Sequence, residues 1–176
     1  MNAKFSNELV VGGCKSGKSR HALTLADGIS TAKKGFIATC VPRDEEMTAR
    51  VRRHQAERDN TWDTLEIPTR LPETIAEKSG HYGIMLVDCI TLWLTNLMLE
   101  DLSQDDILVR VDRLADALGR SKSPIILVSN EVGAGIVPEN AMARQFRDTA
   151  GLANQRLAAA CDTVFWMVAG IAVKIK

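Results

Sequence analysis

The residues with the clearest chemical purpose form a glycine-rich run near the amino terminus, Gly12-Gly13-Cys14-Lys15-Ser16-Gly17-Lys18-Ser19, with the pattern G-x-x-x-x-G-K-S. Glycines let the backbone curl so that several N–H groups point inward at phosphate oxygens. In this pattern Lys18 reaches the β- and γ-phosphates of a nucleoside triphosphate, and Ser19 ligates Mg²⁺. Because an apolar strand precedes the run and a helix follows it, we predict a phosphate-binding loop.

A carboxylate that could share the metal follows a second apolar run. The segment Ile84–Val87 is apolar up to Asp88, which is typical of a Walker B strand. In such a strand the terminal carboxylate holds Mg²⁺ directly or through water. The same aspartate could instead cap the helix that continues through Thr91-Leu92-Trp93-Leu94, and the two roles are compatible.

His54 lies in a highly charged segment, Asp44–Arg58, which has too few apolar positions to bury a wide face. The pattern is that of a solvated helix. Arg50 and His54 are four residues apart and therefore share a helix face. Arginines around an imidazole disfavour its cationic form, so a neutral, nucleophilic His54 is expected near pH 7. From these residues alone, a functional histidine and an ordinary surface position both stay open.

Two further features have weaker signals. The segment Ser129–Asn140 follows an apolar strand, and ligands of open α/β sheets lie outside the carboxyl ends of strands. Asn130 and Glu131 are therefore expected to face the active site, unless the segment is an ordinary connection. His21 is expected to support or cover the phosphate loop, and His81, in a turn, to face solvent.

Composition restricts the class of protein. The 176 residues fit one domain, residues 1–176, and Lys plus Arg equals Asp plus Glu at 22 each. Without a basic excess, nucleic acid is not an expected partner. The four cysteines show no zinc spacing. The amino-terminal residues are polar, and no apolar run approaches the roughly 20 residues that span a bilayer. We therefore expect a cytoplasmic protein with no membrane insertion.

Short apolar runs alternate with longer amphipathic stretches, which predicts an α/β domain with a mainly parallel sheet flanked by helices. The expected strands are Leu9–Val11, Gly35–Ala38, a weaker one at Thr64–Ile67, Ile84–Asp88, Ile125–Ser129, Thr163–Val168 and an edge strand in Ile171–Lys176. The expected helices are Lys18–Ala26, Asp44–Arg58, Pro72–Lys78, Leu92–Leu99, Asp105–Leu118 and Ala141–Ala160.

The chain resembles the bifunctional adenosylcobinamide kinase/adenosylcobinamide-phosphate guanylyltransferases of cobalamin biosynthesis. The resemblance runs in the family's order over nearly the whole chain. Its segments are GGCKSGKSRHA (Gly12–Ala22), IATC (Ile37–Cys40), DEEMTARVRRHQAER (Asp44–Arg58), WDTLEIP (Trp62–Pro68), VDCITLWLTNLM (Val87–Met98), VSNEVGAGIVPEN (Val128–Asn140), RQFRDTAGLANQRLA (Arg144–Ala158) and VAGIAVKIK (Val168–Lys176).

The resemblance implies a P-loop NTPase (RecA-like) fold, a homotrimer and two reactions that use ATP and GTP with Mg²⁺. Adenosylcobinamide is phosphorylated, and GMP from GTP is then transferred to adenosylcobinamide phosphate through a GMP–histidine intermediate at His54. Lys18 and His54 would be catalytic, and Ser19 and Asp88 would bind the metal. The implied nucleotide contacts are Gly12, Gly13, Cys14, Lys15, Ser16, Gly17, Lys18, Ser19, Ala38, Thr39, Cys40, Gln55, Ala56, Glu57, Arg58, Glu66 and Asp88.

The departures from the family pattern are modest. Cys14-Lys15 stands where the family usually has Ala-Arg, Asp59 replaces a frequent proline, and Ala134 replaces a larger apolar residue. None of these changes removes a group that the chemistry needs. Two other functions stay open: a small-molecule kinase that never uses His54, and a regulatory P-loop switch. The choice of ATP or GTP for the kinase step, the base that activates the acceptor and the corrinoid docking surface are not determined by the sequence.

Overall fold

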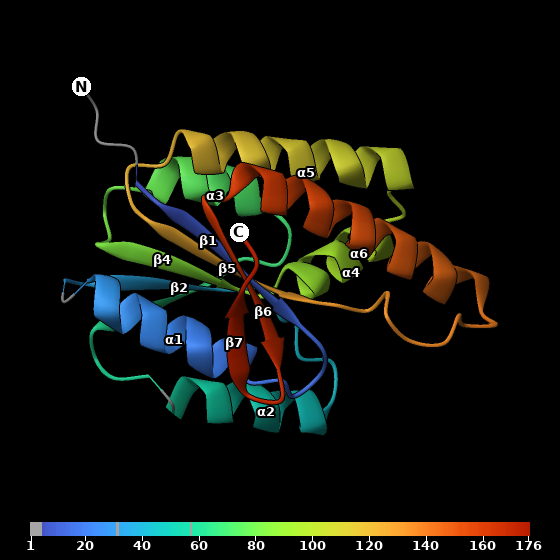
Figure 1. The fold of residues 1–176 in the computed structure, drawn as a ribbon, viewed down its shortest axis with the longest axis horizontal. Coiled ribbons are helices and arrows are strands. Elements are labelled where there is room, and N and C mark those ends of the chain that lie inside the picture. Colours follow the sequence, from blue (N-terminus) through green and yellow to red (C-terminus); the bar gives the residue numbers. More distant parts are fainter. Residues whose placement is uncertain (1–4, 31, 57) are drawn as a thin grey trace.

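The computed structural model describes residues 5–30, 32–56 and 58–176, except for the side chains of Arg50 and His54. A single seven-stranded sheet runs through it in the order β3-β2-β4-β5-β1-β6-β7 (Figure 1). Neighbouring strands pair in parallel, and β7 alone is antiparallel to its neighbour. The strands are β1 (Asn7–Gly12), β2 (Lys34–Ala38), β3 (Trp62–Glu66), β4 (Ile84–Asp88), β5 (Ile125–Asn130), β6 (Thr163–Val168) and β7 (Ile171–Lys174). The expected α/β class is confirmed.

Helices cover both faces of the sheet. In Figure 1, α1 and α2 lie on one side, and α3, α5 and α6 lie on the other. The helices are α1 (Lys18–Ile29), α2 (Glu45–Ala56), α3 (Leu71–Lys78), α4 (Ile90–Leu99), α5 (Gln104–Gly119) and α6 (Ala141–Ala160). Each face has its own core: Trp93 and Leu114 belong to one buried cluster, and Ala22 and Ala26 of α1 belong to the other.

The central strands show why the sequence pattern was informative. All four residues Ile84–Val87 of β4 are fully buried, and so are Ile125–Leu127 of β5. Parallel strands that carry helices on both faces are buried on both sides, so they appear in the sequence as nearly continuous apolar runs.

Helix ends differ from the expected bounds in two informative places. Helix α2 ends at Ala56, two residues before the expected end at Arg58. Helix α4 begins at Ile90 with Cys89 as its N-cap and no side-chain cap. Asp88 therefore belongs to β4, and the reading of Asp88 as the helix cap was wrong.

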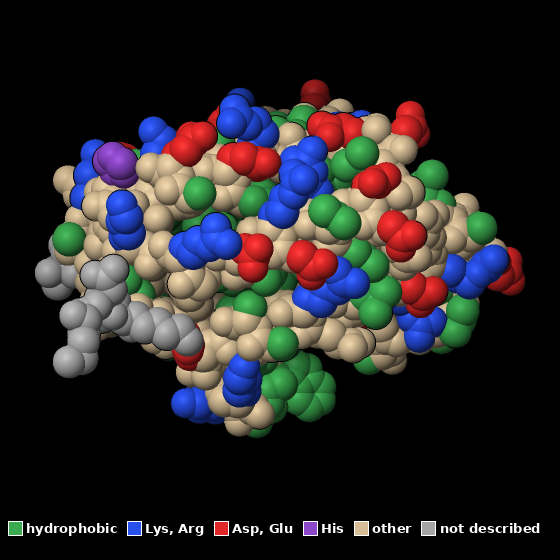
Figure 2. All heavy atoms as spheres, turned by 90° about the horizontal axis from the view of Figure 1, so that it is seen from above, with side chains coloured by type: hydrophobic (Ala, Val, Ile, Leu, Met, Phe, Trp, Pro, Cys, Tyr) green, Lys and Arg blue, Asp and Glu red, His purple; other side chains and the backbone are tan. Residues whose placement is uncertain are grey.

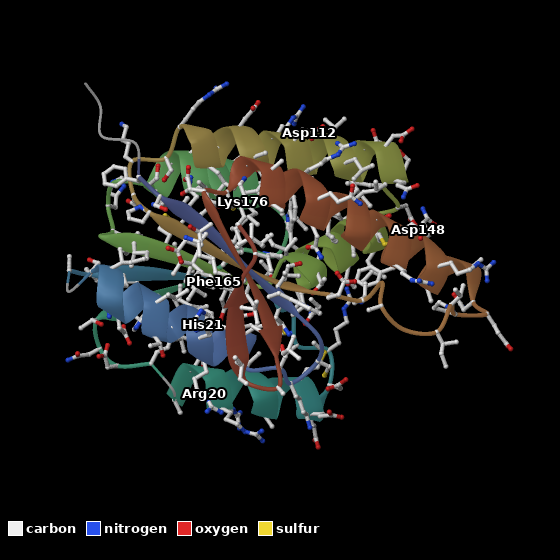
Figure 3. All side chains as sticks on the ribbon, in the orientation of Figure 1. Arg20, His21, Asp112, Asp148, Phe165 and Lys176 are labelled. Carbon is white, nitrogen blue, oxygen red and sulfur yellow. The ribbon has the colours of Figure 1, made fainter. Side chains whose placement is uncertain are left out.

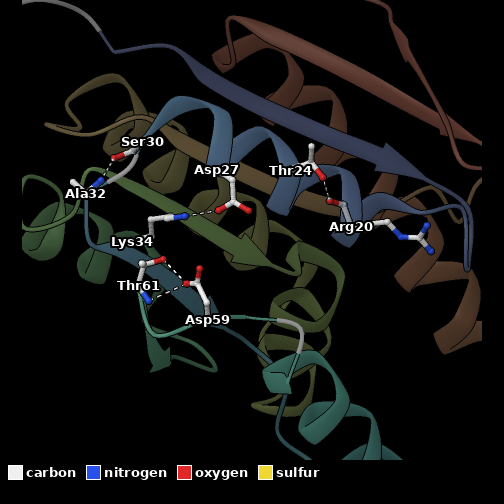
Figure 4. A network of polar contacts seen from close by, with 8 residues as sticks. All are labelled: Arg20, Thr24, Asp27, Ser30, Ala32, Lys34, Asp59 and Thr61. Atoms are coloured by element: carbon white, nitrogen blue, oxygen red, sulfur yellow. Dashed lines mark hydrogen bonds and ion pairs between the residues drawn. The ribbon is translucent and has the colours of Figure 1, made fainter.

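A polar network joins the elements at the amino edge of the sheet, away from the phosphate loop (Figure 4). The buried Lys34 of β2 forms an ion pair with Asp27 of α1 and lies over the Trp62 ring of β3, 5.1 Å from its centroid. Just before β3, the amide of Thr61 donates to Oδ1 of Asp59 at 2.9 Å. These contacts fix the point at which the chain leaves the α2 segment and enters β3.

The surface over α5 and α6 carries acidic and basic side chains interspersed with one another (Figure 2). One such pair is Arg156 with Asp112, whose Nη1 and Oδ2 atoms lie 2.6 Å apart. Within the described residues, no helix is both long enough and apolar enough to cross a membrane.

Candidate functional site

The predicted site lies at the carboxyl edge of the sheet, where ligands of open α/β sheets bind. Strand register aligns three of the predicted residues in one row: Glu66 is opposite Ala38, and Ala38 is opposite Asp88. The phosphate loop leaves β1 on the same edge, two strands from β4. At about 4.8 Å between strands, β1 and β4 are about 10 Å apart, a span that a polyphosphate can bridge.

The phosphate loop has the backbone that its glycines allow. Gly17, the N-cap of α1, has a φ of 95°. Lys15 also adopts a positive φ, at 52°. Gly12 is required for space, because a Cβ there would lie 2.6 Å from the carbonyl oxygen of Met167 and 2.8 Å from Oγ of Ser16.

The side chains of the loop are gathered where phosphate would lie. Lys18 is largely buried, and its Nζ donates to the carbonyl oxygen of Gly13 at 2.5 Å. Ser19 is half-buried in the first turn of α1. Oγ of Ser16 is buried and has no hydrogen-bond partner among the described residues. A buried polar atom without a partner is costly, so this hydroxyl is suited to a polar ligand.

Neighbouring segments brace the loop from two sides. The amide of Gly170, in the β6–β7 turn, donates to the carbonyl oxygen of Ser16 at 3.1 Å. The amide of Glu131, after β5, donates to the carbonyl oxygen of Gly12 at 2.9 Å. The loop is thus tied to β5 and to the hairpin as well as to β1 and α1.

Asp88 and Lys18 act on one common neighbour, the thiol of Cys89. The pKa of Cys89 is raised to about 11, mainly because the thiol is buried; the Asp88 carboxylate adds to the rise, and the Lys18 ammonium opposes it. Both charges are therefore within electrostatic reach of the same sulfur. Asp88 is half-buried, and the peptide bond that joins it to Cys89 is cis.

The oxygen donors of Asp88 and Ser19 fit Mg²⁺. This ion prefers hard oxygen ligands and is usually held by one or two carboxylates together with substrate phosphates and water. Among the described residues, no cluster of three His, Cys, Asp or Glu side chains exists that would bind a metal without such help. The arrangement suits a metal that is bound together with a nucleotide.

The residues after β2 differ in how far they are exposed. Ala38 and Cys40 are half-buried, whereas Thr39 is fully buried. Beyond them, a hollow of about 230 Å³ lies between the ends of β2, β3 and α4. It is lined by Val41, Arg43, Pro68, Thr69, Asn96, Leu99 and Glu100.

His54, Gln55 and Ala56 form the last turn of α2, where Gln55 and Ala56 are exposed. The predicted contact Glu57 lies outside the described residues. Beyond it, the guanidinium of Arg58 lies 3.7 Å from the centroid of the Phe36 ring, and its Nη2 donates to Oγ1 of Thr64 at 3.2 Å. Arg58 is therefore placed against β2 and β3, on the strands that lie furthest from the phosphate loop.

The other two histidines lie in different surroundings. His21 meets the Phe165 ring edge to face, with ring centroids 5.1 Å apart (Figure 3). Burial lowers the pKa of His21, so its neutral form is favoured. This histidine joins α1 to β6. His81 is exposed, as expected.

Asn130 and Glu131 were expected to face the active site, and in the structure both side chains form hydrogen bonds within the protein. The carboxylate of Glu131 accepts from the amide of Gly133 at 2.6 Å, so it is turned onto its own loop. Nδ2 of Asn130 donates to Oγ1 of Thr91 at 2.6 Å, and Nδ2 of Asn154 donates to the carbonyl oxygen of Asn130 at 3.1 Å. Thr91 and Asn154 were missed from the sequence, since isolated polar residues in helices carry no signal of such a contact.

Comparison with known proteins agrees with this geometry. Residues 8–175 match the family model described as "Cobinamide kinase / cobinamide phosphate guanyltransferase". Among solved structures, an ATPase domain superposes with a TM-score of 0.55 at 12% sequence identity, covering 93% of this chain and 69% of that one. This likeness bears on the fold alone and confirms the RecA-like P-loop architecture.

Three curated relatives are similar over nearly their whole length. The bifunctional adenosylcobalamin biosynthesis protein CobU of Escherichia coli (strain K12) is 41% identical over 96% of this chain and 98% of its own. CobP of Pseudomonas aeruginosa is 41% identical over 96% of both chains, and CobU of Salmonella typhimurium is 42% identical over 96% of this chain and 98% of its own. The chain therefore belongs to the family of bifunctional cobinamide kinases and cobinamide phosphate guanyltransferases.

Proposed function

We propose that this chain phosphorylates adenosylcobinamide with a nucleoside triphosphate and then transfers GMP from GTP onto adenosylcobinamide phosphate, yielding adenosylcobinamide-GDP and pyrophosphate. Family membership supports the pair of reactions. The observation that carries the proposal for these residues is a phosphate loop with Lys18 folded onto Gly13, at the same carboxyl edge of the sheet as Asp88, and a buried Ser16 hydroxyl that has no partner among the described residues.

In the kinase step, the loop backbone and Lys18 hold the triphosphate and stabilise the charge that develops on the transferred phosphoryl group. Ser19 and Asp88 are the residues that would hold Mg²⁺. When bound, this ion offsets negative charge on the phosphate oxygens. The braces from Gly170 and Glu131 keep the loop in one shape, so the donors are in place before the substrate arrives.

In the guanylyl step, His54 is the nucleophile. An imidazole nitrogen attacks the α-phosphorus of GTP; an N–P bond forms while the P–O bond to the leaving pyrophosphate breaks. A phosphate oxygen of adenosylcobinamide phosphate then attacks the same phosphorus, and the N–P bond breaks to return neutral His54. The position of His54 in α2 supports this role, because its chain neighbours Arg53 and Gln55 are exposed on a helix that lies at the surface.

The active form is proposed to be a homotrimer in the cytoplasm, as the family resemblance implies. Apolar side chains on the outer face of the β6–β7 hairpin support an interface between copies: Trp166, Val168, Ile171 and Val173 are all exposed. Trp166 pairs with Val173, and Val168 pairs with Ile171, so the four share one face of the hairpin. An exposed apolar patch of this kind is typical of a surface that another protein covers.

The direct test is to incubate the purified protein with Mg²⁺, GTP and adenosylcobinamide and to identify the products by mass. Adenosylcobinamide phosphate and then adenosylcobinamide-GDP are expected. Nucleotide hydrolysis that proceeds equally without the corrinoid would indicate a regulatory switch instead. A product that stops at the phosphate would indicate a simple kinase.

A further inference from the structure

Thr39 makes three hydrogen bonds to Asp88, the last residue of β4, and to Cys89, which follows it. Its Oγ1 donates to the carbonyl oxygen of Cys89 at 2.7 Å and accepts from the amide of Cys89 at 2.9 Å. Its own amide donates to the carbonyl oxygen of Asp88 at 3.3 Å. Regular pairing of β2 with β4 ends at Ala38 and Asp88, so Thr39 extends the junction by one residue through its side chain.

Thr39 is itself immobilised. It is fully buried, and its carbonyl oxygen accepts from Nδ2 of Asn96 on α4 at 2.8 Å. The same nitrogen donates to the carbonyl oxygen of Pro68 at 3.0 Å, after β3. The amide, the carbonyl and the hydroxyl of Thr39 are all used within the protein. Its hydroxyl is therefore engaged with Cys89 and is not directed at a nucleotide.

We propose that Thr39 is a positioning residue for Asp88, acting through the backbone of Asp88 and Cys89. The inference rests on the proposed role of Asp88 as a metal ligand. No side-chain hydrogen bond or ion pair of Asp88 is seen among the described residues, so the observed hydrogen bonds hold the backbone that carries the carboxylate and not the carboxylate itself. Thr39 holds that backbone at the Asp88 carbonyl, the Cys89 amide and the Cys89 carbonyl.

A residue that orients a metal ligand should change metal dependence more than nucleotide affinity. Loss of an outer partner of a ligand typically weakens metal binding about 10- to 100-fold. Thr39→Val keeps the branched shape but removes the hydroxyl, leaving the buried Cys89 amide without its partner and the Cys89 carbonyl with the amide of Trp93 alone. We expect the dissociation constant for Mg²⁺, measured by calorimetric titration of the protein with a non-hydrolysable nucleotide bound, and the half-saturating Mg²⁺ concentration of the kinase step to rise about 10-fold, with KM for the nucleotide changed less than about 2-fold.

Two further variants separate positioning from general destabilisation. Thr39→Ser keeps the hydroxyl and should restore the wild-type Mg²⁺ dependence. Thr149→Val is the matched control: Thr149 is also fully buried, and its Oγ1 donates to the carbonyl oxygen of Gln145 at 2.7 Å, within α6. This control should leave the Mg²⁺ dependence unchanged, whatever it does to the melting temperature.

Asp88→Asn, measured in parallel, distinguishes this inference from the proposed function. If Asp88→Asn raises the Mg²⁺ requirement and Thr39→Val does not, Thr39 has no positioning role. If Asp88→Asn has no effect, Asp88 is not a metal ligand, and the proposed positioning role of Thr39 is excluded as well. A higher KM for the nucleotide in Thr39→Val at saturating Mg²⁺ would make Thr39 a nucleotide contact. If Thr39→Val does not fold, Asn96→Ala is the alternative test, because it removes the hydrogen bond to the Thr39 carbonyl. An unchanged Mg²⁺ dependence in Asn96→Ala would overturn the inference.

Discussion

Nζ of Lys18 donates a hydrogen bond to the carbonyl oxygen of Gly13, 2.5 Å away, so the lysine is folded over the loop that precedes its own helix. A lysine ammonium has three hydrogens to donate, and this contact uses one of them. The side chain is therefore oriented by the loop that would bind the phosphates.

From this contact we expect Lys18→Ala to abolish cobinamide phosphorylation while the protein stays folded. The lost ammonium binds the loop and would stabilise the transferred phosphoryl group, and it is not part of either apolar core. Product formation and the melting temperature are measured together. Lys122→Ala is the control, because Lys122 is exposed before β5 at the opposite edge of the sheet. Near-normal phosphorylation by Lys18→Ala would refute the assigned role.

The cysteines offer a chemical probe of the loop. Cys14 is exposed in the loop, whereas Cys89 and Cys161 are buried. Burial raises the pKa of Cys89 to about 11 and that of Cys161 to about 12, so little thiolate is present at neutral pH. With iodoacetamide near neutral pH, we expect rapid alkylation of Cys14 and slow alkylation of Cys89 and Cys161, read out by peptide mass.

Nucleotide should protect this thiol. A triphosphate bound with Mg²⁺ in the loop would cover Cys14, so its alkylation should slow at saturating ATP or GTP. Unfolded protein, in which all four cysteines are accessible, serves as the control for labelling. An alkylation rate at Cys14 that is the same with and without nucleotide would place the triphosphate elsewhere.

The proposed assembly predicts a mass. Light scattering at micromolar concentration should give about 58 kDa, three times the 19.3 kDa of one chain. Ile171→Lys places a charge on the apolar face of the β6–β7 hairpin and should lower this mass. Val109→Lys is the matched control, because Val109 on α5 is similarly exposed but lies outside the hairpin. A single-chain mass for the wild-type protein would rule out the trimer.

The buried strands were predictable because their physics is local. A strand with helices on both faces is a nearly continuous apolar run, so Ile84–Asp88 was predicted with the observed bounds. The edge strand β3 is half-exposed, and its mixed sequence WDTLE led to an expected strand at Thr64–Ile67, shifted by up to two residues. The exposed helix α2 was predicted from its charge, and only its end residues were wrong.

Contacts that depend on strand order could not be predicted. Thr39 and Cys89 are 50 residues apart, and they meet because β2 and β4 are neighbours in the sheet. Nothing in either segment indicates that pairing. Arg58 is a similar case: its ring contact with Phe36 depends on the chain returning to β3 after α2. The resemblance indicated which positions matter and did not reveal how Thr39 and Arg58 are held.

The sharpest prediction concerns one atom of His54. Attack of imidazole nitrogen on GTP gives a phosphoramidate, whose P–N bond is expected to break in acid and to survive in alkali, whereas a serine or threonine phosphoester shows the opposite preference. GTP labelled at the α-phosphate should therefore label the protein in an acid-labile, alkali-stable form. Label at the γ-phosphate should not be retained, because it leaves with pyrophosphate.

His54→Asn should lose both this labelling and guanylyl transfer while phosphorylation of adenosylcobinamide survives. Arg53→Ala is the graded control: it removes an exposed positive charge that attracts GTP but leaves the nucleophile, so labelling should slow without disappearing. Acid-labile GMP on the His54→Asn variant would show that another histidine is the nucleophile. His21, packed against Phe165, is less accessible than the exposed His81. Loss of the kinase step together with the labelling would instead place His54 in a pocket that serves both reactions, because a dedicated nucleophile has no part in phosphoryl transfer to the hydroxyl.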